Sequence, residues 1–249
     1  MLESLKLWTK KLLARFGLEL RPVAAIPEAG PRDRELIETV RPFTMTSLES
    51  LWSTLISVRH VVRNQVAGAF VECGVWRGGQ SALAARVFQS EHDVRDLWLF
   101  DTFAGMTAPT TADVNLFGQS SLETFRRHQK GDVNTWAYAS LPEVRKVMES
   151  TGYPSERVHF VEGPVETTLR AGHLPERIAV LRLDTDWYES TKVELEMLYP
   201  RLAPGGVLIV DDYGHYAGAR QAVDEYFAAQ HVFPLLQPID YSGRILVRV

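Results

Sequence analysis

Short apolar runs alternate with helical segments through most of this chain, and this alternation constrains the fold more than any other feature of the sequence. The runs are nearly continuous in Val, Leu, Ile and Phe, which is typical of strands that a parallel sheet buries on both faces. We expect such strands over residues 70–75, 97–102, 158–162, 178–184 and 207–212.

Helical segments separate these strands, at about 79–89, 164–171, 189–201 and 217–229. Repeated strand–helix–strand units place helices on both faces of one sheet. After the last helix, the stretches "FPLLQPI" and "RILVRV" follow each other closely and are expected to form an antiparallel hairpin at one edge. The sequence therefore predicts an α/β fold with a doubly wound, mostly parallel, seven-stranded sheet.

The start of the chain lies outside this alternation. Residues 1–17 have apolar positions at helical spacing that Lys and Arg interrupt, which predicts an amphipathic helix rather than a signal peptide. A stretch rich in Pro and Ala over residues 21–34 predicts a linker, and helical spacing returns over residues 46–66 after Ser and Thr as N-cap candidates. We therefore divide the chain into N-terminal helices and a linker over residues 1–66 and a main domain over residues 67–249.

One segment of the main domain is too long for a simple connection between strands. Residues 104–156 separate the second and third expected strands, and helical stretches are expected within this segment at 120–130 and near 141–150. Long insertions at the edge of a sheet are more often lids or binding loops than structureless loops. We expect a helical lid or a cap that faces the substrate.

Composition excludes several classes of protein. A net charge of −4 gives no general electrostatic attraction for nucleic acid, and no run approaches the roughly twenty apolar residues that span a bilayer. Cys73 is the single cysteine of the sequence, so no intrachain disulfide forms and the chain fits a reducing compartment. We expect a cytoplasmic protein that has neither a nucleic-acid partner nor a transmembrane segment.

A glycine-rich turn follows the first expected strand, in the stretch "FVECGVWRGGQS" at residues 70–81. Gly74, Gly78 and Gly79 allow the backbone to turn tightly and to approach a ligand, although their spacing is not the dinucleotide-binding pattern. Glu72 lies just before the turn, where its carboxylate would repel a pyrophosphate and suits a cationic amino group. The alternative is that this carboxylate accepts hydrogen bonds from nearby backbone N–H groups.

An acidic residue also ends the second expected strand. In doubly wound folds an acid at the position of Asp101 commonly holds a ribose diol, although a carboxylate there can also cap a turn. Phe103 and Met106 follow and could line an adenine pocket. A nucleoside with a positively charged amino-acid end fits this set of residues, so we expect S-adenosylmethionine rather than NAD.

Two expected core strands end in paired carboxylates, in "LRLDTDWYEST" at 181–191 and "GVLIVDDYGHY" at 206–216. Neighbouring strands lie about 4.8 Å apart, so Asp184, Asp211 and Asp212 are expected to converge at one end of the sheet. Carboxylates this close repel one another unless a cation joins them or some keep a proton. Oxygen ligands of this kind suit Mg²⁺ or another hard divalent cation, and capping of the following helices is the alternative.

Four motifs together point to a known family. "VECGVWRGG", "LFDTFAGM", "LRLDTDWYEST" and "GGVLIVDDYGHYAGARQAVDEYF" occur in this order, and over roughly residues 42–249 the chain resembles the macrocin O-methyltransferase family. The resemblance implies a Rossmann-like class I methyltransferase fold and an Mg²⁺-dependent enzyme that methylates a sugar hydroxyl with S-adenosylmethionine. The sugar would belong to a glycoside, a natural product or a surface polysaccharide.

The resemblance also implies roles for individual residues. It makes Asp184, Asp211 and Asp212 the metal ligands and Asp186 the general base. His215 could assist this base or contact the sugar, and a surface histidine without such a role is the alternative. The residues expected to bind the cofactor are Glu72, Gly74, Gly78, Gly79, Ser81, Asp101, Thr102, Phe103 and Asp184.

Two other functions remain open at this point. A catechol-type O-methyltransferase would use the same metal chemistry on an aromatic diol. A module that binds the cofactor or a glycan without turnover is the other alternative, although it has no need for a base beside a metal cluster. We expect the N-terminal amphipathic helix to dock on its own domain or on a second subunit, and therefore a homo-oligomer.

Overall fold

The computed structural model describes residues 8–9, 12–13, 15, 26–131, 133–172 and 174–249. The amphipathic helix expected over residues 1–17 lies mostly outside these residues, as does the first part of the expected linker. Within the part of the chain that the structure describes, no helix combines the length and the apolar composition that crossing a membrane requires.

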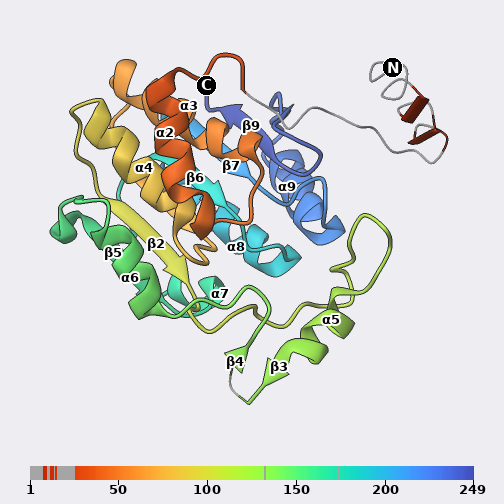
Figure 1. The fold of residues 1–249 in the computed structure, drawn as a ribbon. Helices are drawn as coiled ribbons and strands as arrows, with labels where there is room; N and C mark the ends of the chain where they lie inside the picture. The colour runs from red at the N-terminus through yellow and green to blue at the C-terminus, as the bar shows by residue number, and fades with distance from the viewer. Residues whose placement is uncertain (1–7, 10–11, 14, 16–25, 132, 173) are drawn as a thin grey trace.

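A seven-stranded sheet forms the centre of the molecule (Figure 1). Strands β1, β2, β5, β6 and β7 are parallel, β9 is antiparallel to β7, and β8 is antiparallel to β9. This topology confirms the predicted fold class. In spatial order the strands are β5 (Val158–Glu162), β2 (Leu97–Asp101), β1 (Ala69–Cys73), β6 (Ile178–Leu183), β7 (Leu202–Val210), β9 (Arg244–Val247) and β8 (Gln237–Pro238).

The strand order reverses between β1 and β6. From β1 the chain builds outward through β2 to β5, and it then returns to the other side of β1 to form β6 and β7. Loops that leave the carboxyl ends of two such strands diverge in opposite directions, and the crevice between them is where ligands bind in open α/β sheets. The topology therefore places a binding site at the carboxyl ends of β1 and β6.

Helices cover both faces of the sheet, which explains why the strands are apolar on both sides. Successive residues of β6 show this, because Val180 packs in one core and Leu181 in the other, and both are fully buried. Burial of one such side chain contributes about 1.5–3 kcal/mol. One layer contains α2 (Pro31–Val40), α3 (Leu48–Arg63), α4 (Gly79–Ser90) and α6 (Leu141–Glu149); the other contains α7 (Val165–Thr168), α8 (Tyr188–Leu198) and α9 (Ala217–Ala229).

Local sequence accounts for the start of the two helices that precede β1. The hydroxyl of Ser47 accepts a hydrogen bond from the backbone N–H of Ser50 at 3.0 Å, so Ser47 is the N-cap of α3 as the sequence indicated. The linker expected over residues 21–34 was too long, because α2 begins at Pro31. Proline suits the first turn of a helix, and the carboxylate of Asp33 there accepts from the N–H of Gly30 at 3.2 Å.

The long segment between β2 and β5 divides into two parts. Its second helix, α6, packs on α4 and contributes Val144 and Met148 to the core, so it serves as the crossover helix to β5. Before α6 come α5 (Ser121–His128) and the two short antiparallel strands β3 (Gln129–Lys130) and β4 (Val133–Asn134), which project from the body of the molecule (Figure 1). We call residues 104–139 the insertion. Short 3-10 turns, η1 (Arg41–Phe43), η2 (Ser155–Arg157) and η3 (Tyr199–Arg201), complete the structure.

The turn after β1 yields a prediction about Gly74. Gly74 has φ +80°, and a Cβ atom there would lie 1.8 Å from the carbonyl oxygen of Asp184. Gly118 has a similar φ of +73°, but a Cβ atom there would have no atom within 4 Å. A substitution at Gly118 therefore measures the cost of the backbone conformation alone. We expect Gly118→Ala to lower the free energy of unfolding by about 1–2 kcal/mol and Gly74→Ala by at least about 4 kcal/mol, as measured by urea unfolding. Equal losses would show that the close approach of β1 to β6 does not require glycine.

Candidate active site at the carboxyl ends of the strands

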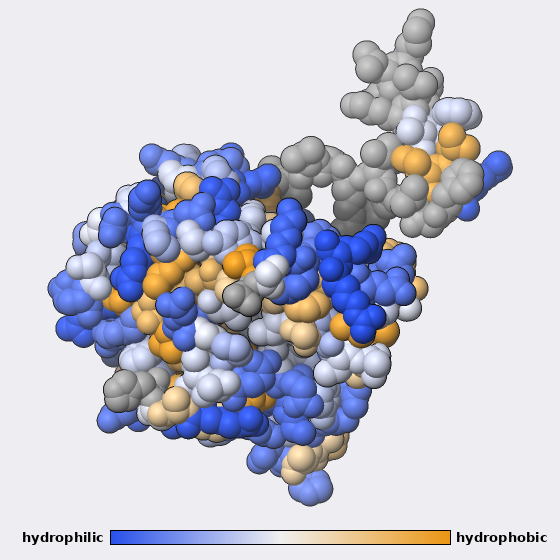
Figure 2. Space-filling model, turned by 90° about the horizontal axis from the view of Figure 1, so that it is seen from below, coloured by the Kyte–Doolittle hydropathy of each residue, from blue (hydrophilic) through white to orange (hydrophobic). Residues whose placement is uncertain are grey.

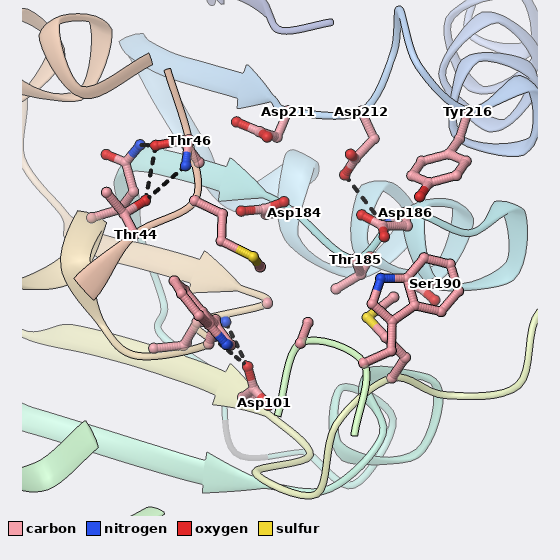
Figure 3. Close-up of a pocket in the computed structure, with 18 of the residues that line it drawn as sticks. Thr44, Thr46, Asp101, Asp184, Thr185, Asp186, Ser190, Asp211, Asp212 and Tyr216 are labelled. Atoms are coloured by element: carbon pink, nitrogen blue, oxygen red, sulfur yellow. Dashed lines mark hydrogen bonds between the residues drawn. The ribbon is translucent and has the colours of Figure 1, made fainter. Parts of the chain in front are cut away.

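A cavity of about 470 Å³ opens at the carboxyl ends of β1, β2, β6 and β7. The turn after β1 and the ends of β2, β6 and β7 line it, and the insertion contributes Met106 and Trp136 to its wall. Figure 3 shows Asp184, Asp211 and Asp212 together on one side of the cavity, with Asp101 on the opposite side. The two groups of acids predicted from the sequence therefore face one space.

Asp101 holds the glycine-rich turn in place. Its Oδ2 accepts hydrogen bonds from the backbone N–H groups of Val75 at 2.6 Å and Trp76 at 2.9 Å, and its Oδ1 accepts from the N–H of Phe103 at 2.8 Å. Burial raises the pKa of Asp101, and these three N–H groups oppose that shift because they stabilise the carboxylate. The capping role that the sequence left open is thus present, and the side chain still lines the cavity.

A buried arginine lies at the centre of the acidic residues. The parallel register sets Arg182 of β6 beside Glu72 of β1, and the two side chains are 0% and 1% exposed. Nη1 of Arg182 donates to Glu72 at 3.0 Å and to Asp184 at 2.6 Å, and Nη2 donates to Asp211 at 2.6 Å. One guanidinium thereby joins carboxylates from β1 and from the ends of β6 and β7.

Three carboxylate side chains meet beside this arginine network. One oxygen from each of Asp184, Asp186 and Asp212 lies within 4.8 Å of the others. Asp186 has a φ of +70°, which is unusual for a residue with a side chain, and its N–H donates to Asp212 Oδ2 at 3.3 Å. Asp211 lies next to this group, but its Oδ1 accepts from Arg182 and from the hydroxyl of Ser50 at 3.2 Å.

The buried carboxyl groups of the site have raised pKa values. Burial, and then the neighbouring carboxylates, raise the pKa of Asp186 to about 8 and that of Asp211 to about 7. The pKa of Asp212 rises well above its usual range for the same reasons. Burial raises the pKa of Glu72 to about 7 although Arg182 opposes the shift. Protons or a cation must therefore balance part of this charge.

The chemistry of this donor set fits a hard divalent cation. Carboxylate oxygens on short, buried side chains are the preferred ligands of Mg²⁺ and Ca²⁺. Asp184 and Asp212 belong both to the predicted ligand set and to the observed group of three. The hydrogen bonds that the Asp211 carboxylate accepts from Arg182 and Ser50 both go to Oδ1, and Asp211 lies outside the group of three.

Most of the residues predicted for the site line the cavity, and some do not. Glu72 and Ser81 lie beneath it, where the hydroxyl of Ser81 donates to Glu72 and Arg182 binds the other carboxylate oxygen. Phe103 packs against Phe160 in the core with ring centroids 6.3 Å apart, and Gly78 is the N-cap of α4. The predicted residues that line the cavity are Gly74, Gly79, Asp101, Thr102, Asp184, Asp186, Asp211, Asp212 and His215.

His215 lies at the wall of the cavity between two tyrosines. Its ring packs edge-on against Tyr216 and Tyr241, with centroids 4.5 Å and 5.8 Å away, and Nδ1 is 3.3 Å from the hydroxyl of Tyr241. Burial lowers the pKa of His215, so the ring favours its neutral form. Trp187, which the sequence places beside the acids, is buried, and its Nε1 donates to the carbonyl of Thr107 at 3.1 Å.

Two segments of the site escaped the sequence interpretation. Residues 43–47, before α3, line the cavity beside the glycine-rich turn, where a Cβ atom on Gly79 would lie 2.6 Å from the carbonyl oxygen of Phe43. Residues 240–242, between β8 and β9, line it as well. The hydroxyl of Ser47 donates to Asp240, and Gln80 of α4 donates to Thr46 at 2.8 Å, which fixes both segments over the strand ends. No sequence motif marks them, because only the tertiary fold brings them together.

Asp113 anchors the insertion to the rest of the site. This fully buried carboxylate accepts from the N–H of Thr110 at 2.7 Å and from the N–H of Tyr188, the first residue of α8, at 2.9 Å. A Cβ atom at Gly218 of α9 would lie 2.1 Å from Asp113 Oδ1, so glycine is needed at that contact. The insertion is therefore attached beside the helix that follows Asp186.

Comparisons with known proteins agree with this geometry. A family model described as Macrocin-O-methyltransferase (TylF) matches residues 28–248. The demethyldecarbamoylnovobiocin O-methyltransferase of Streptomyces niveus is 36% identical over 202 residues, which cover 80% of this chain and 73% of that protein. The 8-demethyl-8-(2,3-dimethoxy-alpha-L-rhamnosyl)-tetracenomycin-C 4'-O-methyltransferase of Streptomyces olivaceus is 36% identical over 201 residues, with the same shares of 80% and 73%. The solved structure of the O-methyltransferase NovP matches with a TM-score of 0.70 and 35% identity over 83% of this chain and 82% of that chain.

The arginine network predicts a pH-dependent stability. The folded-state pKa values of Glu72 and Asp211 are about 7, above their ordinary values of 4.5 and 3.8, so these groups make the folded protein less stable as pH rises through that window. Without the guanidinium of Arg182 their pKa values rise further, and the loss of stability extends above pH 7. We expect Arg182→Met to lower the free energy of unfolding by about 3–5 kcal/mol at pH 8 and by clearly less at pH 5, as measured by urea unfolding.

Arg63→Met is the matched control for this experiment. Arg63 is 64% exposed and pairs with Glu91 at 3.2 Å, so its removal should change stability by no more than about 0.5 kcal/mol. A loss for Arg182→Met that is the same at pH 5 and pH 8 would contradict the electrostatic account and would indicate lost packing instead.

Proposed function

The chain belongs to the macrocin-O-methyltransferase family, and from this premise we propose that it transfers the methyl group of S-adenosylmethionine to a hydroxyl of a sugar, with a divalent cation such as Mg²⁺ at the acidic residues. One observation supports the proposal above all. The acids of β6 and β7 share a single cavity with the glycine-rich turn and Asp101, so a donor nucleoside and a charged acceptor site can lie side by side.

We assign the donor to the side of the cavity formed by β1 and β2. Gly74 and Gly79 line this side of the cavity, and Asp101 offers a carboxylate where a ribose diol is held in such folds. Arg182 compensates Glu72 beneath this region, so the carboxylates that this side of the cavity itself presents are those of Asp101 and Asp184. The cationic end of S-adenosylmethionine, its ammonium and sulfonium groups, suits this negative environment.

The acceptor is a sugar hydroxyl in this proposal. The names of the relatives from Streptomyces niveus and Streptomyces olivaceus describe O-methylation of natural products, and the second name includes a rhamnosyl group. The acceptor side of the cavity has Trp136, Tyr216 and Tyr241 in its wall, and aromatic rings of this kind pack against the C–H faces of sugars. Two vicinal hydroxyls could face Asp184 and Asp212 together.

Asp186 is the residue that takes the proton of the hydroxyl. Its carboxylate faces the cavity beside Asp184 and Asp212, and burial raises its pKa toward the pH at which a general base works best. Asp184 and Asp212, with Asp211 next to them, would hold the cation. When bound, a divalent cation stabilises negative charge on the hydroxyl oxygen. Arg182 keeps Asp184 and Asp211 in fixed positions, and the cavity then brings the oxygen and the methyl group to near-attack distance.

The role of Asp186 gives the first test of this proposal. We expect Asp186→Asn to lower kcat for methyl transfer between about 100-fold and 10,000-fold, while binding of S-adenosylhomocysteine stays within about threefold, because the substitution removes the base and keeps the shape. The measurement is methyl transfer to a panel of methyl glycosides of hexoses and 6-deoxyhexoses, with catechol included. Asp96→Asn is the control, since Asp96 pairs with His159 at the opposite end of the sheet.

Two outcomes would contradict the proposal. A variant Asp186→Asn with nearly full kcat would remove the assigned base. Transfer to catechol with none to any glycoside would replace the sugar acceptor by an aromatic diol.

The cation site is tested by binding rather than by turnover. We expect Mg²⁺ or Mn²⁺ to bind the protein loaded with S-adenosylhomocysteine, and Asp212→Asn to weaken that binding at least about tenfold, because one charged ligand is lost. Isothermal titration calorimetry measures both, with Asp96→Asn again as control. Equal affinity in Asp212→Asn, or full methyl transfer in excess EDTA, would show that the acids serve another purpose.

A further inference from the structure

A second hollow lies next to the candidate active site. It has a volume of about 590 Å³ and is formed by the insertion on one side and by α9 on the other. Asn115 and Leu116 contribute from the insertion, and Gln221, Asp224 and Glu225 contribute from α9. We call this hollow the α9 groove. None of its α9 side chains takes part in the proposed methyl transfer.

The α9 groove and the active-site cavity share a wall. His215 lines both of them, and Tyr216, which lines the cavity, pairs through its backbone with Asn115 of the groove. On another side of the cavity, the hydroxyl of Ser47 donates to Asp240 and joins the two segments above the strand ends. His215 is therefore the side chain that a substituent of the acceptor sugar would have to pass to reach the groove.

The polar groups of the α9 groove are held in fixed positions. Asp224 accepts from the hydroxyl of Tyr213 at 2.8 Å, and Glu225 accepts from the hydroxyl of Tyr188 and from the amide of Gln221, both at 2.7 Å. Arg220 donates to the carbonyl of Tyr213 at 3.0 Å and lies over that ring. The carboxylates of Asp224 and Glu225 thus have lone pairs that can still accept hydrogen bonds. The guanidinium of Arg220 beside them already donates to Tyr213.

This charge distribution excludes two kinds of substituent. A nucleoside diphosphate would bring negative charge close to Asp224 and Glu225, which repel it. A flat apolar group would cover both carboxylates without offering them a hydrogen bond, which is costly. The face that carries α5, β3 and β4 is also mainly hydrophilic, with hydrophobic residues in small groups (Figure 2).

A neutral, hydroxylated group satisfies the same surface. Its hydroxyls can donate to Asp224 and Glu225 and can bond to the Gln221 amide, and its C–H face can pack on Leu116, which is 46% exposed. We propose that the α9 groove binds a second sugar unit, attached to the sugar that is methylated. This inference rests on the proposed function, and it places the methylation after the glycosidic bond has formed.

The experiment compares four derivatives of one accepting sugar, the panel glycoside that is methylated fastest. They are its methyl glycoside, a disaccharide with that sugar at the non-reducing end, its p-nitrophenyl glycoside and the same sugar linked to a nucleoside diphosphate. We expect kcat/KM for the disaccharide to exceed that for the methyl glycoside about tenfold or more, the value of one or two good hydrogen bonds. The nucleoside diphosphate should react more slowly than the methyl glycoside.

Variants of α9 assign any preference to the groove. We expect Gln221→Ala to lower the ratio of kcat/KM for the disaccharide over the methyl glycoside about tenfold. The double variant Asp224→Asn, Glu225→Gln should raise kcat/KM for the nucleoside diphosphate relative to the methyl glycoside. Gln230→Ala is the control, because Gln230 caps the far end of the same helix, outside the groove, and should leave every ratio unchanged.

The outcomes separate this inference from the proposed function. No transfer to any glycoside, with S-adenosylhomocysteine binding intact, would contradict the proposed function itself. Equal kcat/KM for all four derivatives, or a preference for the p-nitrophenyl glycoside that Gln221→Ala leaves unchanged, would contradict the second-sugar site alone.

Discussion

The guanidinium of Arg182 is the interaction on which the rest of the site depends. This arginine is fully buried in a central strand, and three carboxylates compensate its charge: Glu72 in β1, Asp184 after β6 and Asp211 after β7. Without such partners, a buried charge would be strongly destabilising. The cost of burying these charges is therefore shared, and removing one member leaves the others uncompensated. The arrangement also fixes the positions of β1, β6 and β7 relative to one another at the end where ligands bind.

One positive charge does not balance the acids gathered there. Asp186 and Asp212 add to the three partners of Arg182, and burial, followed by repulsion among these carboxylates, raises the pKa values of Asp186, Asp211 and Asp212. Such a site attracts cations, and the proposed function supplies two of them, a divalent metal and the cationic donor. The folded protein without ligands is less stable because of these acids, and the same acids give the site its affinity for cations. Such a trade-off between stability and function is common at catalytic sites.

Much of this arrangement could be predicted from the sequence because it depends on local pattern. Nearly continuous apolar runs predicted the parallel strands, and acids that directly follow such runs had to meet at one edge of the sheet. The sequence interpretation did not identify Arg182 as the partner of Glu72. A single arginine in an otherwise apolar strand was nevertheless a signal, because a buried cation requires a buried acid nearby. The segments over residues 43–47 and 240–242 and the anchor Asp113 carry no local signal, since only the packing of distant elements defines them.

We propose that the acids at the ends of β6 and β7 form a cation site beside the methyl donor. Crystals grown with S-adenosylhomocysteine and Mn²⁺ test it directly, because an anomalous difference map locates the metal. We expect one strong peak within about 2.2 Å of carboxylate oxygens of Asp184 and Asp212, with the Arg182–Asp211 contact intact. A peak elsewhere, or none at saturating Mn²⁺ with the cofactor in place, would contradict it.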